Sequence, residues 1–67
     1  MPFIPGDRVR VIRSTLRDYI GLEGVILTIQ RDEDAIFNTY RIRTDSGNES
    51  EFLEYQLEAV SRDGSLL

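Results

Sequence analysis

The sequence predicts a single all-β domain built around one long central strand. At 67 residues, the chain has room for one hydrophobic core. No stretch is typical of a long helix, whereas several short stretches alternate apolar and polar residues, as half-buried strands do. One apolar run, Val25-Ile26-Leu27, follows two glycines and is apolar at both sets of alternating positions. We therefore expect a small sheet that curls over itself and covers both faces of this strand.

The central strand is expected to run from about residue 22 to about residue 31. Successive side chains of a strand point to opposite sides, so its apolar residues divide between two faces. These are Val25, Leu27 and Ile29 on one face, and Leu22 and Ile26 on the other. Gly21 and Gly24 would allow a bend and the close passage of another chain segment. The strand would then serve both halves of the curled sheet.

The first strand is expected before this one, in residues 8–13, where Pro5-Gly6-Asp7 provides the preceding turn. Its alternation would place Val9 and Val11 inward and the arginines outward. Residues 14–20 lack a sustained period and are expected to form a loop. One of the larger side chains of this loop would fold back onto the core, namely Leu16, Tyr19 or Ile20.

Three consecutive acids, residues 32–34, are expected to end the central strand in a loop tip. The alternation then resumes in residues 40–43, with Tyr40 and Ile42 inward. Residues 45–48 have the composition of a hairpin turn, in which Gly47 would take a positive φ.

The C-terminal part is expected to continue with a strand in residues 50–53 that pairs back across this turn and buries Phe52. One 3₁₀ turn is expected within residues 53–57, because the segment is too short for an α-helix. A last short strand, residues 58–60, would complete the domain (residues 1–60), and residues 61–67 would form a loose tail. Five short strands with one 3₁₀ turn before the last describe a small SH3-like barrel.

Composition narrows the classes of function. The chain has no Cys and no His, which excludes disulfides and the usual zinc sites, and we expect no cofactor. Its formal net charge of −4 argues against a general nucleic-acid binder, whose affinity comes from neutralising phosphates. The apolar runs are too short for a membrane span, and the N-terminal residues lack a signal pattern. We expect a cytoplasmic protein, either free or bound peripherally to a membrane complex.

The sequence gives little support for an enzymatic site. Without His or Cys, a nucleophile would need a Ser or Thr activated by a neighbouring carboxylate, and no spacing in the sequence indicates such a pair. Residues 32–34 could bind a hard cation, but the spacing of a calcium loop is absent, so a solvated loop tip is the better interpretation. A proline-peptide groove needs exposed aromatics. The sequence has no Trp, and Tyr19 and Tyr55 are expected in the core or at its rim.

The arginines are the remaining candidates for a binding site. All eight basic residues are Arg, which is favoured over Lys where carboxylates or phosphates are bound bidentately. The candidate partner-binding residues lie on the outward faces of two strands, Arg8, Arg10, Arg41 and Arg43, or flank the first loop, Arg13 and Arg17. The alternative is a solvated outer face balanced by neighbouring Glu residues. A functional patch would favour an acidic protein over a long polyanion, because acids surround it.

The N-terminal part resembles a known family. Gly6-Asp7-Arg8-Val9-Arg10-Val11-Ile12, followed by Gly21-Leu22-Glu23-Gly24-Val25-Ile26, is similar to the opening of KOW-type SH3-like barrels, which include ribosomal proteins and transcription elongation factors. The loop between the two segments is longer than usual in that family, and the glycine expected soon after the first strand is missing. This resemblance implies a nucleic-acid- or ribosome-associated module.

A second resemblance accounts for the longer loop. The small docking subunits of photosynthetic electron transport, such as the stromal E subunit of photosystem I and the S subunit of the photosynthetic NDH-1 complex, have this loop. Their C-terminal pattern is similar to Glu51-Phe52-Leu53-Glu54-Tyr55-Gln56-Leu57-Glu58-Ala59-Val60. The resemblance implies a non-catalytic docking subunit that binds an acidic electron carrier of the ferredoxin type. Fold analogy alone does not establish function, and a regulatory or phage-encoded protein that uses the same barrel is a third alternative.

Overall fold

The computed structural model describes residues 3–31, 33–34 and 36–60. These residues form one five-stranded antiparallel sheet with the strand order β4-β3-β2-β1-β5. In chain order the elements are β1 (Arg8–Val11), the 3₁₀ turn η1 (Arg17–Tyr19), β2 (Glu23–Gln30), β3 (Thr39–Thr44), β4 (Glu49–Leu53), the 3₁₀ turn η2 (Glu54–Gln56) and β5 (Leu57–Ala59). The prediction of five strands with a 3₁₀ turn before the last is therefore confirmed. Strand order ends at β4 and β5, which do not pair with each other in the described part of the chain.

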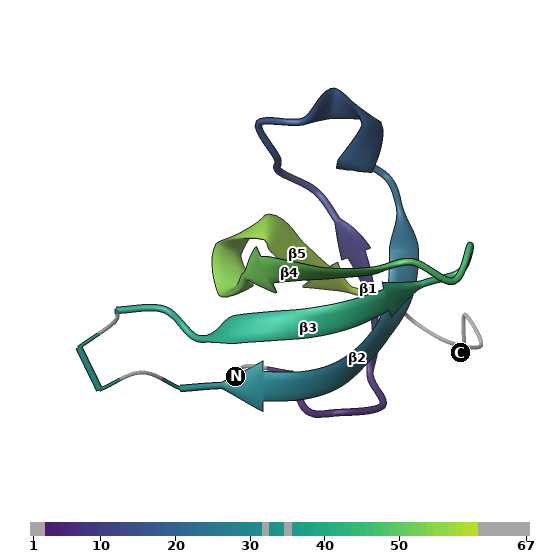
Figure 1. Ribbon diagram of the computed structural model, residues 1–67. Helices are drawn as coiled ribbons and strands as arrows, with labels where there is room; N and C mark the ends of the chain where they lie inside the picture. The colour runs from purple at the N-terminus through teal and green to yellow at the C-terminus, as the bar shows by residue number, and fades with distance from the viewer. Residues whose placement is uncertain (1–2, 32, 35, 61–67) are drawn as a thin grey trace.

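Strand β2 connects the two halves of the sheet, as expected. Its first residues, Glu23 to Val25, pair with β1, and Gly24 to Gln30 pair with β3. The strand is long and curved, and it crosses from one end of the molecule to the other (Figure 1). Strand β2 thus joins the β1–β5 pair and the β3–β4 pair into one sheet.

The side chains of β2 do not alternate as the sequence predicts. Ile26 pairs with Ile42, but the next partner of β3 is Thr28, so Leu27 is an extra residue in the ladder. Such a β-bulge interrupts the alternation and bends the strand. Both Leu27 and Ile29 are half-buried, but it is Ile29 that packs against the core that contains Ile26. The predicted sharing of one face by Val25, Leu27 and Ile29 is wrong for this reason.

The core is a compact cluster of side chains from all five strands. Its buried members are Val9, Val11, Ile26, Tyr40, Ile42, Phe52 and Leu57. The inward positions predicted from alternation in the first, third and fourth strands are confirmed. From the first loop, Tyr19 packs edge-on against Phe52, with ring centroids 5.7 Å apart. Leu16 and Ile20, the other two candidates for this role, are exposed.

Two glycines occupy positions that larger residues would not tolerate. A Cβ atom on Gly24 would lie 2.8 Å from the Cα of Thr44, so the backbone of β3 occupies the space a side chain would need. Gly47 has a φ of +99°, as the hairpin turn was predicted to require. Its N–H donates to the carbonyl oxygen of Thr44 at 2.8 Å.

Element boundaries differ from the prediction by one or two residues. The last strand begins at Leu57 instead of residue 58, and η1 within the first loop was not predicted. Glu33 and Asp34 lie in an exposed turn, as expected, while the predicted tail (residues 61–67) and Asp32 lie outside the described residues. No helix in the described ranges has the length and apolar character that a membrane span requires.

Candidate functional site

The outward face of β5, β1 and β2 carries a continuous series of salt bridges. Arg10 lies between two carboxylates, 2.7 Å from Glu58 and 2.9 Å from Glu23. Glu23 also contacts Arg8 at 3.2 Å, and Arg8 reaches Asp45 at 2.8 Å. The register places Arg10 opposite both Glu23 and Glu58, so these contacts follow directly from strand pairing.

These contacts stabilise the charged forms of the groups involved. Hydrogen bonds from Arg10 and Arg8 hold the pKa of the Glu23 carboxyl below its ordinary value. The hydrogen bond from Arg8 likewise lowers the pKa of Asp45. In turn, hydrogen bonds to Asp45 and Glu23 raise the pKa of Arg8. The contacts therefore favour the ionised forms of Arg8, Glu23 and Asp45.

A second group of ion pairs covers the outward face of β3 and β4. Arg41 contacts Glu49 at 3.0 Å and Glu51 at 3.2 Å, and Arg43 contacts Glu49 at 3.4 Å. The hydrogen bond from Arg41, followed by that from Arg43, lowers the pKa of Glu49. Strand register again explains the contacts, because Arg41 lies opposite Glu51 and Arg43 opposite Glu49.

Four of the six arginines proposed as partner-binding residues are thus neutralised within the sheet. Each of Arg8, Arg10, Arg41 and Arg43 has at least one carboxylate partner on a neighbouring strand or turn. This arrangement corresponds to the alternative stated above, an outer face balanced by acidic neighbours. An acidic partner that engages these arginines would compete with carboxylates of the chain itself for part of their N–H donors.

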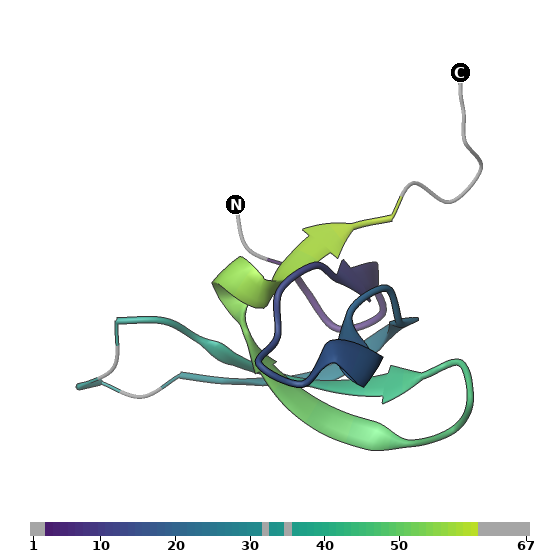
Figure 2. The same ribbon diagram turned by 90° about the horizontal axis from the view of Figure 1, so that it is seen from above.

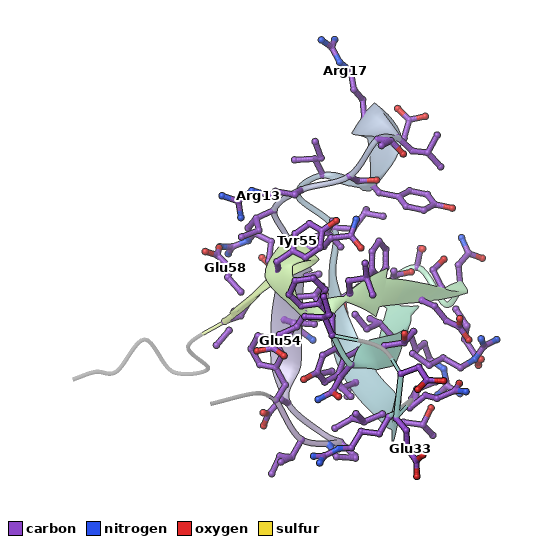
Figure 3. The ribbon with its side chains drawn as sticks, turned by 90° about the vertical axis from the view of Figure 1, so that its left-hand side faces the viewer. Arg13, Arg17, Glu33, Glu54, Tyr55 and Glu58 are labelled. Atoms are coloured by element: carbon purple, nitrogen blue, oxygen red, sulfur yellow. The ribbon has the colours of Figure 1, made fainter. Side chains whose placement is uncertain are left out.

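The two arginines of the first loop differ from these four. Arg13 donates from its guanidinium to the backbone carbonyl oxygen of Tyr55 at 3.3 Å, and no carboxylate pairs with it among the described residues. The Arg17 side chain is exposed and makes no hydrogen bond or salt bridge within the described part of the chain. Figure 3 shows it extending away from the tip of the loop. Leu16 and Ile20, on either side of η1, are 57% and 49% exposed.

Gln56 fastens η2 to the base of this loop. Its side-chain oxygen accepts from the backbone N–H of Leu53 at 2.8 Å, and its side-chain amide donates to the carbonyl oxygen of Arg13 at 3.2 Å. Its own carbonyl oxygen accepts from the N–H of Ile12 at 2.8 Å. Sequence reasoning missed this role. The only signal was a polar residue directly before a buried leucine.

An aromatic groove lies beside η2. The rings of Phe37 and Tyr55 meet edge to face, with centroids 5.3 Å apart, although both are more than 40% exposed. The groove has a volume of about 410 Å³ and is lined by Phe3, Ile36, Phe37, Glu54, Tyr55 and Leu57. The rim position expected for Tyr55 is consistent with this. Phe37 was not singled out, because its contact with Tyr55 depends on the folded chain.

The structure adds no candidate for a metal centre. In residues 3–31, 33–34 and 36–60, no group of three or more His, Cys, Asp or Glu side chains is arranged to hold a metal ion. The exposed acids on the sheet are engaged by arginines instead.

Comparisons with known proteins leave the family open. No family model matches the sequence, and neither a curated protein nor a solved structure matches it significantly. Function must therefore be argued from the surface of the chain itself.

Proposed function

We propose that the chain is a small SH3-like barrel that acts as a non-catalytic docking module in a larger protein assembly. The barrel assignment is supported by β2, whose first residues pair with β1 while most of its length pairs with β3. It is also supported by the position of η2 directly before β5. Seen from above, the sheet is strongly curved, as a small barrel requires (Figure 2).

The docking surface we propose is the first loop, residues 12–22, and its partner is an acidic protein. One observation carries this proposal: Arg17 has no carboxylate partner among the described residues, and the turn η1 to which it belongs is flanked in sequence by two exposed aliphatic residues, Leu16 and Ile20. A cation flanked by apolar surface is suited to a protein partner that presents a carboxylate next to an apolar patch. Arg13 lies at the base of the same loop and extends the positive charge.

An acidic electron carrier of the ferredoxin type is the partner class that the resemblance to photosynthetic docking subunits suggests. We place the contact with this partner on the first loop and not on the outward face of the sheet, because the arginines of the sheet already have acidic partners. A KOW-like role on RNA is the second candidate. It rests on the same unpaired arginines, and it is disfavoured by the net charge of −4.

Chemical-shift mapping distinguishes these alternatives. The isotopically labelled chain is titrated with a ferredoxin-type acidic protein and, separately, with a short RNA duplex. Docking as proposed predicts amide shifts from the acidic protein that cluster in the first loop, residues 12–22. Amide shifts confined to β1, β3 and β4 would show that the acidic protein binds the outward face of the sheet instead of the first loop. Shifts from RNA alone would support the KOW-like role, and the absence of shifts from either ligand would contradict both.

A further inference from the structure

We infer that the aromatic groove beside η2 binds an extended segment of a partner protein that carries apolar side chains and a lysine or arginine. The inference goes beyond the proposed contact of the first loop with an acidic partner and does not depend on it. The groove draws its lining from the N-terminal segment, the β2–β3 connection, η2 and the start of β5. The N-terminal segment, the β2–β3 connection and the contiguous η2 and β5 are far apart in sequence, so the fold brings them together.

The lining of the groove is mainly apolar and exposed. Ile36 is 90% exposed, Phe37 43% and Tyr55 47%. Contiguous apolar surface of this kind on a small protein marks an interaction site more often than isolated exposed residues do. Burying aromatic rings that already stand in place is favourable, because little side-chain freedom remains to be lost. Phe37 and Tyr55 hold each other edge to face before any ligand arrives.

The shape of the groove favours an extended chain as its occupant. Its volume of about 410 Å³ has room for a few side chains of a partner. An extended segment can insert alternate side chains into such a groove while its backbone and remaining side chains stay in water. The groove is bordered by η2, which the contacts of Gln56 with Leu53 and Arg13 hold in position.

The charge of the groove specifies a basic residue in that segment. Glu54 is the charged side chain that lines the groove, and its carboxylate makes no hydrogen bond or salt bridge within the described residues. Most of the sheet carboxylates, by contrast, are paired with arginines. Figure 3 shows Glu54 and Tyr55 on the same end of the molecule, with Arg13 and Arg17 on the first loop above them. A lysine or arginine of the ligand would therefore pair with Glu54 while neighbouring apolar residues cover Tyr55 and Phe37.

The test is a selection from a random twelve-residue peptide library on the wild-type chain, followed by affinity measurements on the enriched peptides. We expect enriched peptides that combine apolar residues with at least one lysine or arginine. Tyr55→Ala should weaken their binding about tenfold or more, as removal of a central aromatic contact does at other interfaces. Gln30→Ala, at an exposed position of β2 that does not line the groove, should leave the affinity unchanged and serves as the control. Amide spectra of each variant verify that the fold is retained.

Glu54→Gln tests the charge separately from the shape. We expect it to weaken binding of a basic peptide several-fold, and to have no effect on the same peptide in which the basic residue is replaced by methionine. Three outcomes would overturn the inference: no enrichment, enrichment of acidic peptides, or equal binding to wild type and Tyr55→Ala. Loss of the first-loop contact with an acidic protein would leave these results unchanged, so the two proposals fail separately.

Discussion

The side-chain amide of Gln56 donates to the backbone carbonyl oxygen of Arg13 at 3.2 Å, across 43 residues of sequence. This contact joins the 3₁₀ turn that presents Tyr55 to the loop that presents Arg17. The two candidate surfaces therefore share one support. Their relative positions depend on a residue that has no direct part in either.

Gln56→Ala should destabilise the chain by about 1–2 kcal/mol, because it removes two side-chain hydrogen bonds and leaves the N–H of Leu53 without its acceptor. Denaturant unfolding measures the change. Gln30→Ala, at the exposed end of β2, is the matched control and should have little effect. Equal losses for the two variants would mean that Gln56 does not fasten η2.

Gly24→Val should destabilise the chain by about 2 kcal/mol or more, because the added side chain would collide with the backbone of β3 at Arg43 and Thr44. Gly24→Ala should already lower the denaturant midpoint, since the Cβ alone is too close to Thr44. An unchanged midpoint for Gly24→Val would contradict the close approach of β2 and β3.

Gly47→Val should cost about 1–2 kcal/mol, because a β-branched residue disfavours the positive φ of this turn. Gly47→Asn should cost clearly less, since Asn adopts that conformation more readily. Both variants are compared by thermal and denaturant unfolding. The same loss for Val and Asn would show that the turn does not require a left-handed residue.

Acid should weaken the fold through the paired carboxylates. Glu23 and Glu49 have pKa values below their ordinary 4.5 in the folded chain, so folding favours their ionised forms. Their contribution to stability is complete above about pH 4.5 and is lost as the pH falls through the lowered folded pKa values. Unfolding midpoints should therefore be constant near neutral pH and decline below it.

Glu23→Gln isolates one of these carboxylates. At pH 7 the variant should be less stable than wild type, and the difference should shrink as acid protonates Glu23 in the wild-type chain. Glu33→Gln is the control, because Glu33 is exposed and makes no salt bridge in the described ranges. A difference between Glu23→Gln and wild type that persists unchanged to pH 3 would rule out the charge explanation.

The sequence predicts the core of the fold well where patterns are local. Alternation identified Val9, Val11, Tyr40 and Ile42 because each strand buries one face, and the hairpin turn was recognisable from Gly47. The bulge at Leu27 left no signal, because Val25, Ile26, Leu27 and Ile29 supply apolar residues to both alternating faces and admit either register.

The candidate site was less accessible to sequence analysis. The six arginines were identified by type, but which of them are paired depends on strand register, as the contact of Arg10 with Glu58 shows. The aromatic groove depends on the contact between Phe37, in the β2–β3 connection, and Tyr55, in η2. Neither the ion pair of Arg10 with Glu58 nor the contact of Phe37 with Tyr55 follows from a local sequence pattern, so both became visible only in the structure.

The most direct test of the docking proposal is the association rate constant with a ferredoxin-type acidic protein, measured for wild type, Arg17→Glu and Arg31→Glu. Arg31 is an exposed arginine beyond the end of β2 and provides the same change of charge outside the first loop. Rates are compared at about 0.01 M and about 0.15 M salt, where charge screening differs strongly. We predict that Arg17→Glu slows association several-fold at low salt and flattens its salt dependence, while Arg31→Glu changes both less. Equal effects of the two variants, or none, would contradict docking through the first loop.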